Sequence, residues 1–352
     1  MPGTPHDALF KAVFGHPEHA RGMLRTIVPA EVGEAVDWRA LTLCPGSFVD
    51  ASLAHQHSDV LYSTRWRTGQ EALLYFLFEH QSSPSTGEPM AFRLLRYQVR
   101  IWERWCAENG KARKLPAIVP IVLYHGAAPW PEARSFEELL DVPTELRLVL
   151  EPHVVRCQYL LQDLSEYSEE ELQEQVWTAL AKVTAVLFQQ ARFDADITTL
   201  LQRWLGVLRE VVSAPNGLDA LAQVLRYILE VNERATPQEL QSLLERELGP
   251  DAKETMMTAA QLLREQGRLQ GREEGRQEGR QEGRQEGRQE EREEGLLRSR
   301  SLLLRLVRLR FGGQLDANSE QRLQNATLEQ VEAWSLRVVT AASLSELFVD
   351  AS

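Results

Sequence analysis

The spacing of apolar residues changes at about residue 160, and this change limits the possible folds more than any other feature of the chain. Before it, short segments with apolar residues at helical spacing alternate with segments of strand-like alternation. After it, leucine and valine recur at helical spacing, apart from one low-complexity tract. We therefore expect an α/β domain over residues 1–160, followed by an all-α region.

The first 160 residues predict two kinds of element in a defined order. A helix is expected from Asp7 to Phe14, with a short helix after it that ends at Ile27. Strands are predicted at residues 41–49, 59–64, 72–81 and 117–124, and a strongly amphipathic helix at residues 90–108. The predicted order of the main elements is therefore αβββαβ.

The rest of the chain divides into three parts by composition. Residues 161–263, which we call the helical region, are interrupted only by glycine, proline and asparagine. Residues 264–295, the glycine tract, repeat the unit Gly-Arg-Gln-Glu. Residues 296–352, the C-terminal module, are leucine-rich and predict a small helical unit.

The glycine tract is poorly suited to form a helix alone. Each glycine costs a helix about 1 kcal/mol relative to alanine, and like charges recur four residues apart. Paired helices would approach closely along the glycine face, with arginine and glutamate flanks meeting. The tract is thus either coil or a paired helix, and we expect a homo-oligomer formed through the C-terminal helices.

Charge and hydropathy restrict the classes of partner. The net charge is -12, yet residues 90–114 contain seven basic and two acidic residues, so a polyanion such as DNA has a docking place. The longest wholly apolar run, from Ala72 to Phe78, is too short for a membrane span. Without a signal peptide at the start, the expectation is a cytoplasmic protein with no membrane partner. The three cysteines lack the spacing of a disulfide framework or a zinc site.

Two carboxylates are predicted to meet across a hairpin. If its turn is centred on Gly69, Asp59 lies directly opposite Glu79, and Gln81 shares the face of Glu79. Paired carboxylates at the end of a sheet suit Mg²⁺, which leaves its other positions to water and phosphate. The alternative is that both carboxylates end their strands in solvent.

Four arginines form a stripe on the predicted helix at residues 90–108. On a wheel of about 100° per residue, they lie opposite the apolar side chains, which include Leu95 and Val99. The stripe consists of Arg93, Arg96, Arg100 and Arg104. Such a stripe is either a solvated face or a track for the DNA backbone.

Four short motifs, in this order, resemble those of the Rpn family of recombination-promoting nucleases, also called putative transposases. They are His6-Asp7-Ala8-Leu9-Phe10-Lys11, Ser58-Asp59, Glu79-His80-Gln81-Ser82 and Leu94-Leu95-Arg96-Tyr97. The similarity covers roughly residues 4–160, and the glycine tract also resembles the family. It implies the PD-(D/E)xK nuclease fold, a restriction-endonuclease-like core, with Asp59 and Glu79 as the acidic metal ligands.

One position departs from the wider superfamily, in which a lysine follows the glutamate by two residues. Gln81 stands there, and a glutamine can orient water but carries no charge. Lys11 is a candidate to supply the missing charge, the alternative being a solvated lysine. Asp7 is either a third acidic group at the metal or the N-cap of its helix.

Two functions remain. The first is a Mg²⁺-dependent DNA endonuclease in which Asp59 and Glu79 hold the ion, Gln81 orients water and the arginine stripe seats phosphate. The alternative is a catalytically silent DNA-binding or assembly factor in recombination or transposition.

Overall fold

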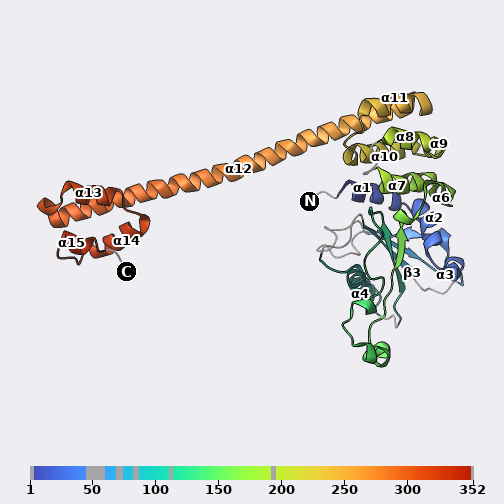
Figure 1. The fold of residues 1–352 in the computed structure, drawn as a ribbon, viewed down its shortest axis with the longest axis horizontal. Coiled ribbons are helices and arrows are strands. Elements are labelled where there is room, and N and C mark those ends of the chain that lie inside the picture. The colour runs from blue at the N-terminus through green and yellow to red at the C-terminus, as the bar shows by residue number, and fades with distance from the viewer. Residues whose placement is uncertain are drawn as a thin grey trace. The chain divides into compact units, whose positions relative to one another are not determined.

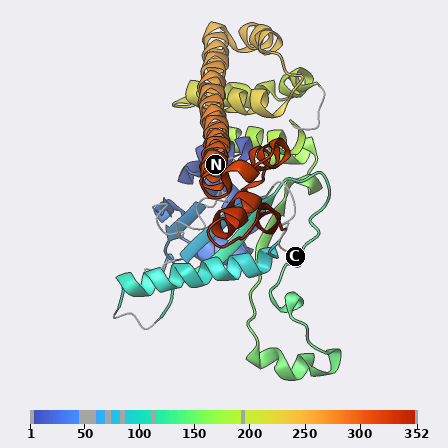
Figure 2. The same cartoon turned by 90° about the vertical axis from the view of Figure 1, so that its left-hand side faces the viewer.

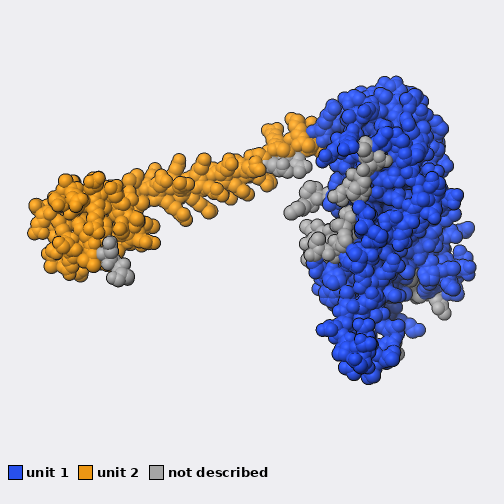
Figure 3. Space-filling view, in the orientation of Figure 1, with its two compact units in different colours: residues 1–264 blue, residues 265–352 orange. Residues whose placement is uncertain are grey.

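A computed structural model describes residues 4–44, 60–68, 74–81, 87–110, 114–191 and 196–349, with the side chains of residues 74–81, 270 and 274 left out. The chain divides into two compact units, Met1–Arg264 and Glu265–Ser352 (Figure 3). The first unit contains the sheet and most of the helices, so it is the part of the molecule that can position a site.

The first unit is a mixed α/β structure (Figure 1). Its elements up to residue 166 are α1 (Pro5–Phe14), α2 (Pro17–Ile27), α3 (Ala30–Ala35), η1 (Trp38–Ala40), β1 (Thr42–Leu43), β2 (Val60–Thr64), β3 (Leu74–Gln81), α4 (Met90–Glu108), β4 (Ala117–Tyr124), η3 (Glu137–Leu139), η4 (Thr144–Leu146), α5 (Arg147–Leu150), η5 (Glu151–His153), β5 (Leu160–Asp163) and η6 (Leu164–Glu166). The predicted order of helix, three strands, helix and strand is present. The fifth strand, β5, was not predicted.

The five strands found in the described residues form one sheet in the order β1-β2-β3-β4-β5. The first three are antiparallel, and β3, β4 and β5 run parallel to one another. In the β2–β3 hairpin Val60 pairs with Phe78 and Thr64 with Leu74. These pairs confirm the predicted register for the described part of the hairpin. Because α4 connects two parallel neighbours, β3 and β4, it serves as their crossover helix.

The sheet separates two apolar cores. Successive residues of a strand point to opposite faces, and accordingly Tyr62 and Leu123 belong to the first core whereas Leu61 and Val122 belong to the second. The first core is built from α1, α2 and the helical region, and includes Phe10, Phe14, Leu187, Phe188, Leu225 and Leu244. The second core lies under α4, which runs across the sheet in Figure 2, and includes Met90, Leu94, Tyr97, Ile101 and Tyr159.

The helical region shares the first core with the N-terminal helices. Its helices are α6 (Glu169–Glu174), α7 (Ala179–Gln190), α8 (Ile197–Arg203), α9 (Leu205–Ser213), α10 (Gly217–Val231) and α11 (Pro237–Leu248). Phe10 of α1 and Leu225 of α10 lie in one continuous apolar cluster. The boundary expected at residue 160 therefore does not separate two cores, because the apolar faces of both segments are buried against each other.

The glycine tract lies within one long helix, α12 (Pro250–Phe311). Ala252 and Met256, near its start, are buried in the first core. At each of the glycines from Gly267 to Gly295, an added Cβ would meet no atom within 4 Å apart from the backbone of its own helix and its chain neighbours. The coil alternative is therefore not observed; whether the helix pairs with a second copy stays a prediction.

The C-terminal module has a core of its own. The end of α12 packs with α13 (Ala317–Gln324), α14 (Leu328–Arg337) and α15 (Leu344–Leu347), after the short η7 (Gly312–Gln314). Trp334 and Phe348 meet edge to face with ring centroids 4.9 Å apart, and the Arg322 guanidinium lies over both rings. This packing gives residues 296–349 an apolar cluster formed by residues of the module itself.

Candidate functional site

The carboxylate pair is predicted at the end of the β2–β3 hairpin, where β2 begins and β3 ends. Asp59 is outside the described residues, and only the backbone of Glu79 is described. Glu79 directly follows Phe78, the partner of Val60, so one further step of the same register would oppose positions 59 and 79. The meeting of the two carboxylates stays a prediction, now based on an observed register.

The parallel strands end together at this side of the sheet. Gln81 of β3 pairs with Tyr124 of β4, which in turn pairs with Asp163 of β5. Glu79 pairs with Val122 two residues earlier. Because the carboxyl ends of parallel strands commonly form binding crevices, this edge is the candidate functional site. Asp163 was missed because β5 was not predicted, whereas Tyr124 ends a strand that was predicted but was not singled out as a site residue.

The Asp163 carboxylate accepts hydrogen bonds from two neighbouring segments at the carboxyl ends of the parallel strands. Its Oδ2 accepts a hydrogen bond from the Trp130 amide (3.1 Å), and its Oδ1 accepts from the amide and hydroxyl of Ser165 (2.9 and 2.7 Å). Burial, together with the Asp163 charge, raises the pKa of the Tyr124 hydroxyl. Asp163 thus orders the loop that contains Trp130 and the turn after β5, and these bonds give it a structural role.

The N-terminus of α1 corrects one expectation for Asp7. The N-cap is Thr4, whose hydroxyl accepts from the Asp7 amide (3.2 Å), while the Asp7 carboxylate accepts from the Thr4 amide (3.1 Å). Asp7 is therefore the third residue of the helix, the N3 partner in a capping box, rather than the N-cap itself. Its role as a metal ligand stays a prediction. Lys11, on the same helix, is exposed, and its catalytic role likewise stays a prediction.

Next to Asp7, His6 joins three parts of the first unit. Its Nδ1 lies 2.9 Å from the Tyr227 hydroxyl of α10, and its ring centroid lies 5.1 Å from that of His125. His125 directly follows Tyr124 at the end of β4. The His125 ring stacks on Phe188 of α7, with ring centroids 4.7 Å apart, and its Nδ1 lies 3.0 Å from the Phe188 carbonyl. Because a carbonyl only accepts, Nδ1 of His125 carries a proton.

The arginine stripe of α4 is only partly exposed. Arg93 is 6% exposed and donates to the Met90 sulfur (3.2 Å), so the exposure expected of it is wrong. Val99, expected in the apolar face, is 42% exposed. The buried face of α4 includes Tyr97 and Ile101, which lie next to Arg93 on the helical wheel. Arg93 is therefore buried together with them.

The other three arginines form ion pairs. Arg96 donates two parallel hydrogen bonds to the Glu88 carboxylate, both 2.7 Å long. Arg100 pairs with Glu103 and Arg104 with Glu108, each at 2.9 Å. An exposed pair such as Arg100–Glu103 is worth only about 0–1 kcal/mol, so a phosphate can compete with its carboxylate. The Arg96–Glu88 pair is part-buried and bidentate, and it is therefore stronger. DNA binding by the stripe stays a prediction.

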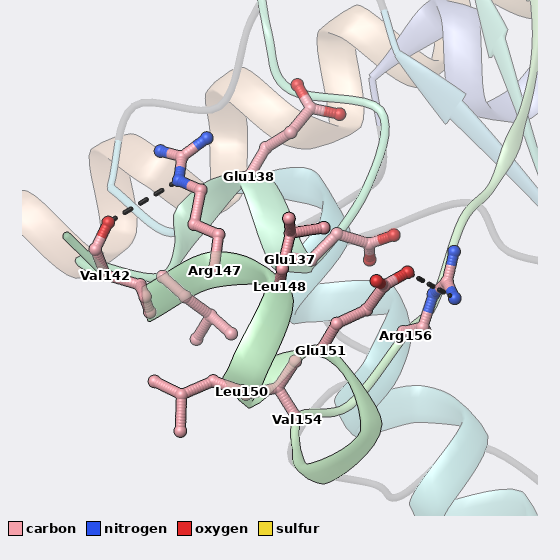
Figure 4. A pocket seen from close by; sticks show the side chains of 10 residues that line it. Glu137, Glu138, Val142, Arg147, Leu148, Leu150, Glu151, Val154 and Arg156 are labelled. Carbon is pink, nitrogen blue, oxygen red and sulfur yellow. Dashed lines mark hydrogen bonds and ion pairs between the residues drawn. The ribbon is translucent and has the colours of Figure 1, made fainter. Parts of the chain in front are cut away.

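Two cavities lie away from this edge. One, of about 290 Å³, lies in the loop between β4 and β5 and is lined by Leu140, Val142, Leu148, Leu150 and Val154, with Glu151 and Arg156 forming an ion pair at its side (Figure 4). The other, of about 700 Å³, lies between the α1–α2 turn and α10 and includes His16 and His19. Neither is lined by a predicted site residue. Among the described side chains, no three His, Cys, Asp or Glu residues are placed to hold a metal.

The sequence matches known proteins over most of its length. Residues 4–219 match the family described as "Putative transposase, YhgA-like". The chain belongs to this family. It is 31% identical to recombination-promoting nuclease RpnD of Escherichia coli O157:H7 over 73% of the chain and 93% of that protein. It is 32% identical to RpnC of Escherichia coli K12, over 75% of the chain and 82% of the relative. No solved structure matches the chain.

The relatives also include a protein that is named as inactive. "Inactive recombination-promoting nuclease-like protein RpnE" of Escherichia coli K12 is 30% identical over 75% of the chain and 83% of that protein. The Rpn resemblance is thus confirmed, and the family contains relatives named as nucleases and relatives named as inactive. No helix among the described residues is both long and apolar enough to cross a bilayer.

Proposed function

We propose that the protein is a metal-dependent DNA endonuclease that hydrolyses phosphodiester bonds and acts in recombination. The observation that carries the proposal is the β2–β3 register, in which Val60 pairs with Phe78, so that one further step of the same register would oppose positions 59 and 79. Relatives named recombination-promoting nucleases support the same reaction class. The αβββαβ order is that of a PD-(D/E)xK core, the nuclease fold that the family resemblance implies.

The donor set at this edge fits a hard divalent cation. Asp59 and Glu79 supply carboxylate oxygens, which Mg²⁺ prefers, and the rest of its coordination would be left to water and phosphate. A bound Mg²⁺ would lower the pKa of a coordinated water and offset the charge of the phosphate. Gln81, two residues after Glu79, orients the attacking water with its amide. Asp7 and Lys11, one turn apart on α1, are the further acidic and basic candidates.

We assign phosphate binding to the arginines of α4. Arg96, Arg100 and Arg104 exchange their carboxylate partners for backbone phosphates, and the exchange releases counterions from DNA. Arg93 contributes by packing, since it is buried under the same helix.

We assign self-association to the C-terminal helices. On α12, Leu302, Leu306 and Leu309 are exposed at helical spacing, on a different face from the buried Leu303 and Val307. A second copy that lies along α12 would cover these leucines and part of the glycine stripe.

A plasmid-nicking assay with Mg²⁺, and again with excess EDTA, tests the proposal. Cleavage in Mg²⁺ only, lost in Glu79→Ala, is the expected result. The second candidate, a catalytically silent DNA-binding factor, is favoured by the relative named inactive. Under that candidate the chain would bind DNA and leave plasmid intact under all conditions.

A further inference from the structure

One face of α4 is apolar and reaches the surface. α4 covers one face of the sheet, so its far side lies on the outside of the first unit (Figure 2). Along this side, apolar residues recur at alternating intervals of three and four, which are the a and d positions of a heptad. They form what we call the α4 seam, which consists of Phe92, Leu95, Val99, Trp102 and Cys106. On a helical wheel the seam fills the arc between the buried residues of α4 and its charged residues.

The chain itself covers the α4 seam only in part. Phe92 is 43% exposed and Val99 is 42% exposed. Phe92 stacks on Phe136, with ring centroids 6.1 Å apart, and the Trp102 indole donates a hydrogen bond to the Pro116 carbonyl (2.9 Å). These contacts hold the two aromatic side chains, while apolar surface remains open along about four turns of the helix. A continuous apolar stripe of this kind is typical of a helix–helix interface.

The charges beside the α4 seam fit a second copy of α4 that runs antiparallel. Arg96 and Glu103 are seven residues apart, so both occupy the e position at the border of the seam. In an antiparallel pair, a residues pack against d residues, and e residues face e residues across the interface. If Val99 of each copy packs against Trp102 of the other, Arg96 of each copy lies beside Glu103 of the other. A shift by one heptad, with Val99 against Leu95, would instead oppose the two copies of Arg96.

We propose that the α4 seam pairs two copies of the chain on DNA, antiparallel and in the register that joins Arg96 to Glu103. A parallel pair lacks this match, since the e residues would then face the uncharged g residues Gln98 and Trp105. Two-fold symmetry repeats the Arg96–Glu103 contact on the other side of the axis. A guanidinium has five N–H donors, so Arg96 can contact this carboxylate while it keeps Glu88. The inference rests on the DNA binding proposed above, which both candidate functions share.

DNA should promote this pairing for two reasons. α4 contains four arginines and two glutamates, so two copies of it repel each other until phosphates offset their charge. A phosphate that binds Arg100 also releases Glu103, whose side chain is 58% exposed, for Arg96 of the second copy. Because the e positions lie on one side of an antiparallel pair, the arginine stripes of both copies lie on the same face and can follow one duplex. Free chains are therefore expected to pair through α4 only weakly.

Disulfide formation in the full chain tests the register, and the chain itself supplies one of the two thiols. In the proposed pair Leu95 lies opposite Cys106 of the second copy, which is exposed, so Leu95→Cys should form disulfide-linked dimers when DNA is present. The matched control is Leu95→Cys with Cys106→Ser. Its two introduced thiols would be about 16 Å apart along the helix axis, too far for a disulfide, so it should stay at the wild-type background. The reactions contain duplex DNA, EDTA to keep the DNA intact, and oxidised glutathione as the oxidant.

Two neighbouring carboxylates separate pairing through the seam from a simple gathering of copies on DNA. Glu103→Gln, added to Leu95→Cys, should lower the disulfide yield about two- to fivefold, as expected for the loss of exposed ion pairs. It should not lower the affinity for DNA, because it frees Arg100. Glu108→Gln, which frees Arg104 in the same way, is the control and should leave the yield unchanged.

The outcomes that would overturn the inference are distinct from failure of the proposed function. A disulfide yield for Leu95→Cys that equals the background, or that DNA does not raise, would overturn the pairing. Disulfide-linked dimers of the control without Cys106 would indicate a parallel pair, and a yield unaffected by Glu103→Gln would contradict the register. DNA binding is measured by gel shift on the same samples. Chains that bind DNA without forming the disulfide contradict the pairing alone, whereas chains that bind no DNA contradict the proposed function together with the pairing.

Discussion

The helices of the helical region and the helix of the glycine tract are stabilised in different ways. α7 buries eight of the nine residues from Leu180 to Phe188, and Lys182 is the exception. The residues of α12 from Glu265 to Gly295 are almost all exposed. Packing therefore stabilises the first set of helices, whereas only backbone hydrogen bonds and charges act along the tract.

The charges of the tract add little to its helix. Ion pairs occur at its ends, where Arg268 pairs with Glu265 and Arg298 with Glu294. Inside the repeat, arginine and glutamate are two residues apart and so lie on different sides of the helix. The comparison predicts that catalysis and stability reside in the packed unit, whereas the tract is a marginal helix that gains from a partner.

The largest effect is expected at the sheet edge of the packed unit. Asp59→Asn or Glu79→Ala should reduce cleavage at least about 1,000-fold, since a metal ligand contributes several kcal/mol to the transition state. The thermal midpoint should change little. Plasmid cleavage and thermal unfolding are measured on the same samples.

Two control variants test whether the chemistry lies in the first unit. Glu278→Ala removes an exposed carboxylate of the tract and should cleave normally. A chain that ends at Leu263 retains the buried residues of α12 up to Ala260, and it should also cleave. Full activity in Glu79→Ala, or loss of activity in both controls, would assign the chemistry to another place.

The second effect concerns the shared first core. Leu187→Ala, at a fully buried site in α7, should lower the free energy of unfolding by about 2–5 kcal/mol. Because the sheet and the helical region share this core, both should unfold in one transition at lower denaturant. Val176→Ala, at a side chain 79% exposed, is the control and should change stability by less than about 0.5 kcal/mol.

Far-UV circular dichroism and tryptophan fluorescence during urea unfolding measure this effect. The C-terminal module should keep its own transition, since its core is formed by residues of the module itself. Separate transitions for residues before and after 160 would restore the boundary that the sequence suggested.

Local pattern was enough to predict much of the sheet. The alternation in β2 and the apolar run of β3, with a turn centred near Gly69, fixed the register. β5 was missed because Leu160–Asp163 is too short to show a period. The contact of His6 with Tyr227 could not be predicted, since no local pattern joins residues that far apart in sequence. A shared core across residue 160 is invisible for the same reason.

The rotation of α4 about its own axis shows a second limit of prediction from the sequence. The apolar residues span a broad arc, and the wheel alone cannot say which margin of the arc is covered. The sheet covers the margin beside Arg93, whose long apolar stem tolerates burial. Val99, at the other margin, stays in solvent. Amphipathicity thus predicted the helix and its general orientation, whereas the packing partner decided its rotation.

A smaller effect is expected for DNA binding by α4. Changing Arg96 and Arg100 to alanine should weaken binding to all DNA sequences alike and reduce the salt slope by about one unit per lost phosphate contact. Glu88→Gln should strengthen binding, because it releases Arg96 from its paired carboxylate. Arg226→Ala, which breaks a similar pair with Glu230 on α10, is the control. Titrations at several salt concentrations measure the slope, and an unchanged slope would leave the stripe as a solvated face.

The smallest effect per residue, and the most direct test of the comparison, lies in the tract. Gly279→Ala and Gly283→Ala should each stabilise an unpaired helix by about 0.5–1 kcal/mol, because a Cβ at either site meets nothing within the chain. In a pair of chains the same methyl groups would stand between closely approaching backbones and should weaken self-association. Gln281→Ala, on another face of the helix, should change neither quantity much.

Helix content and self-association should change in opposite directions only if two copies pair through the glycine face. A four-residue period exceeds 3.6, so the glycine stripe advances by about 40° per repeat, which favours a right-handed crossing between two copies. Circular dichroism should show more helix in the double alanine variant, while sedimentation should show fewer dimers than for wild type at the same concentration. The chain that ends at Leu263 should be largely monomeric. If all these chains sediment with equal mass per chain, the tract is an unpaired helix and self-association through it is wrong.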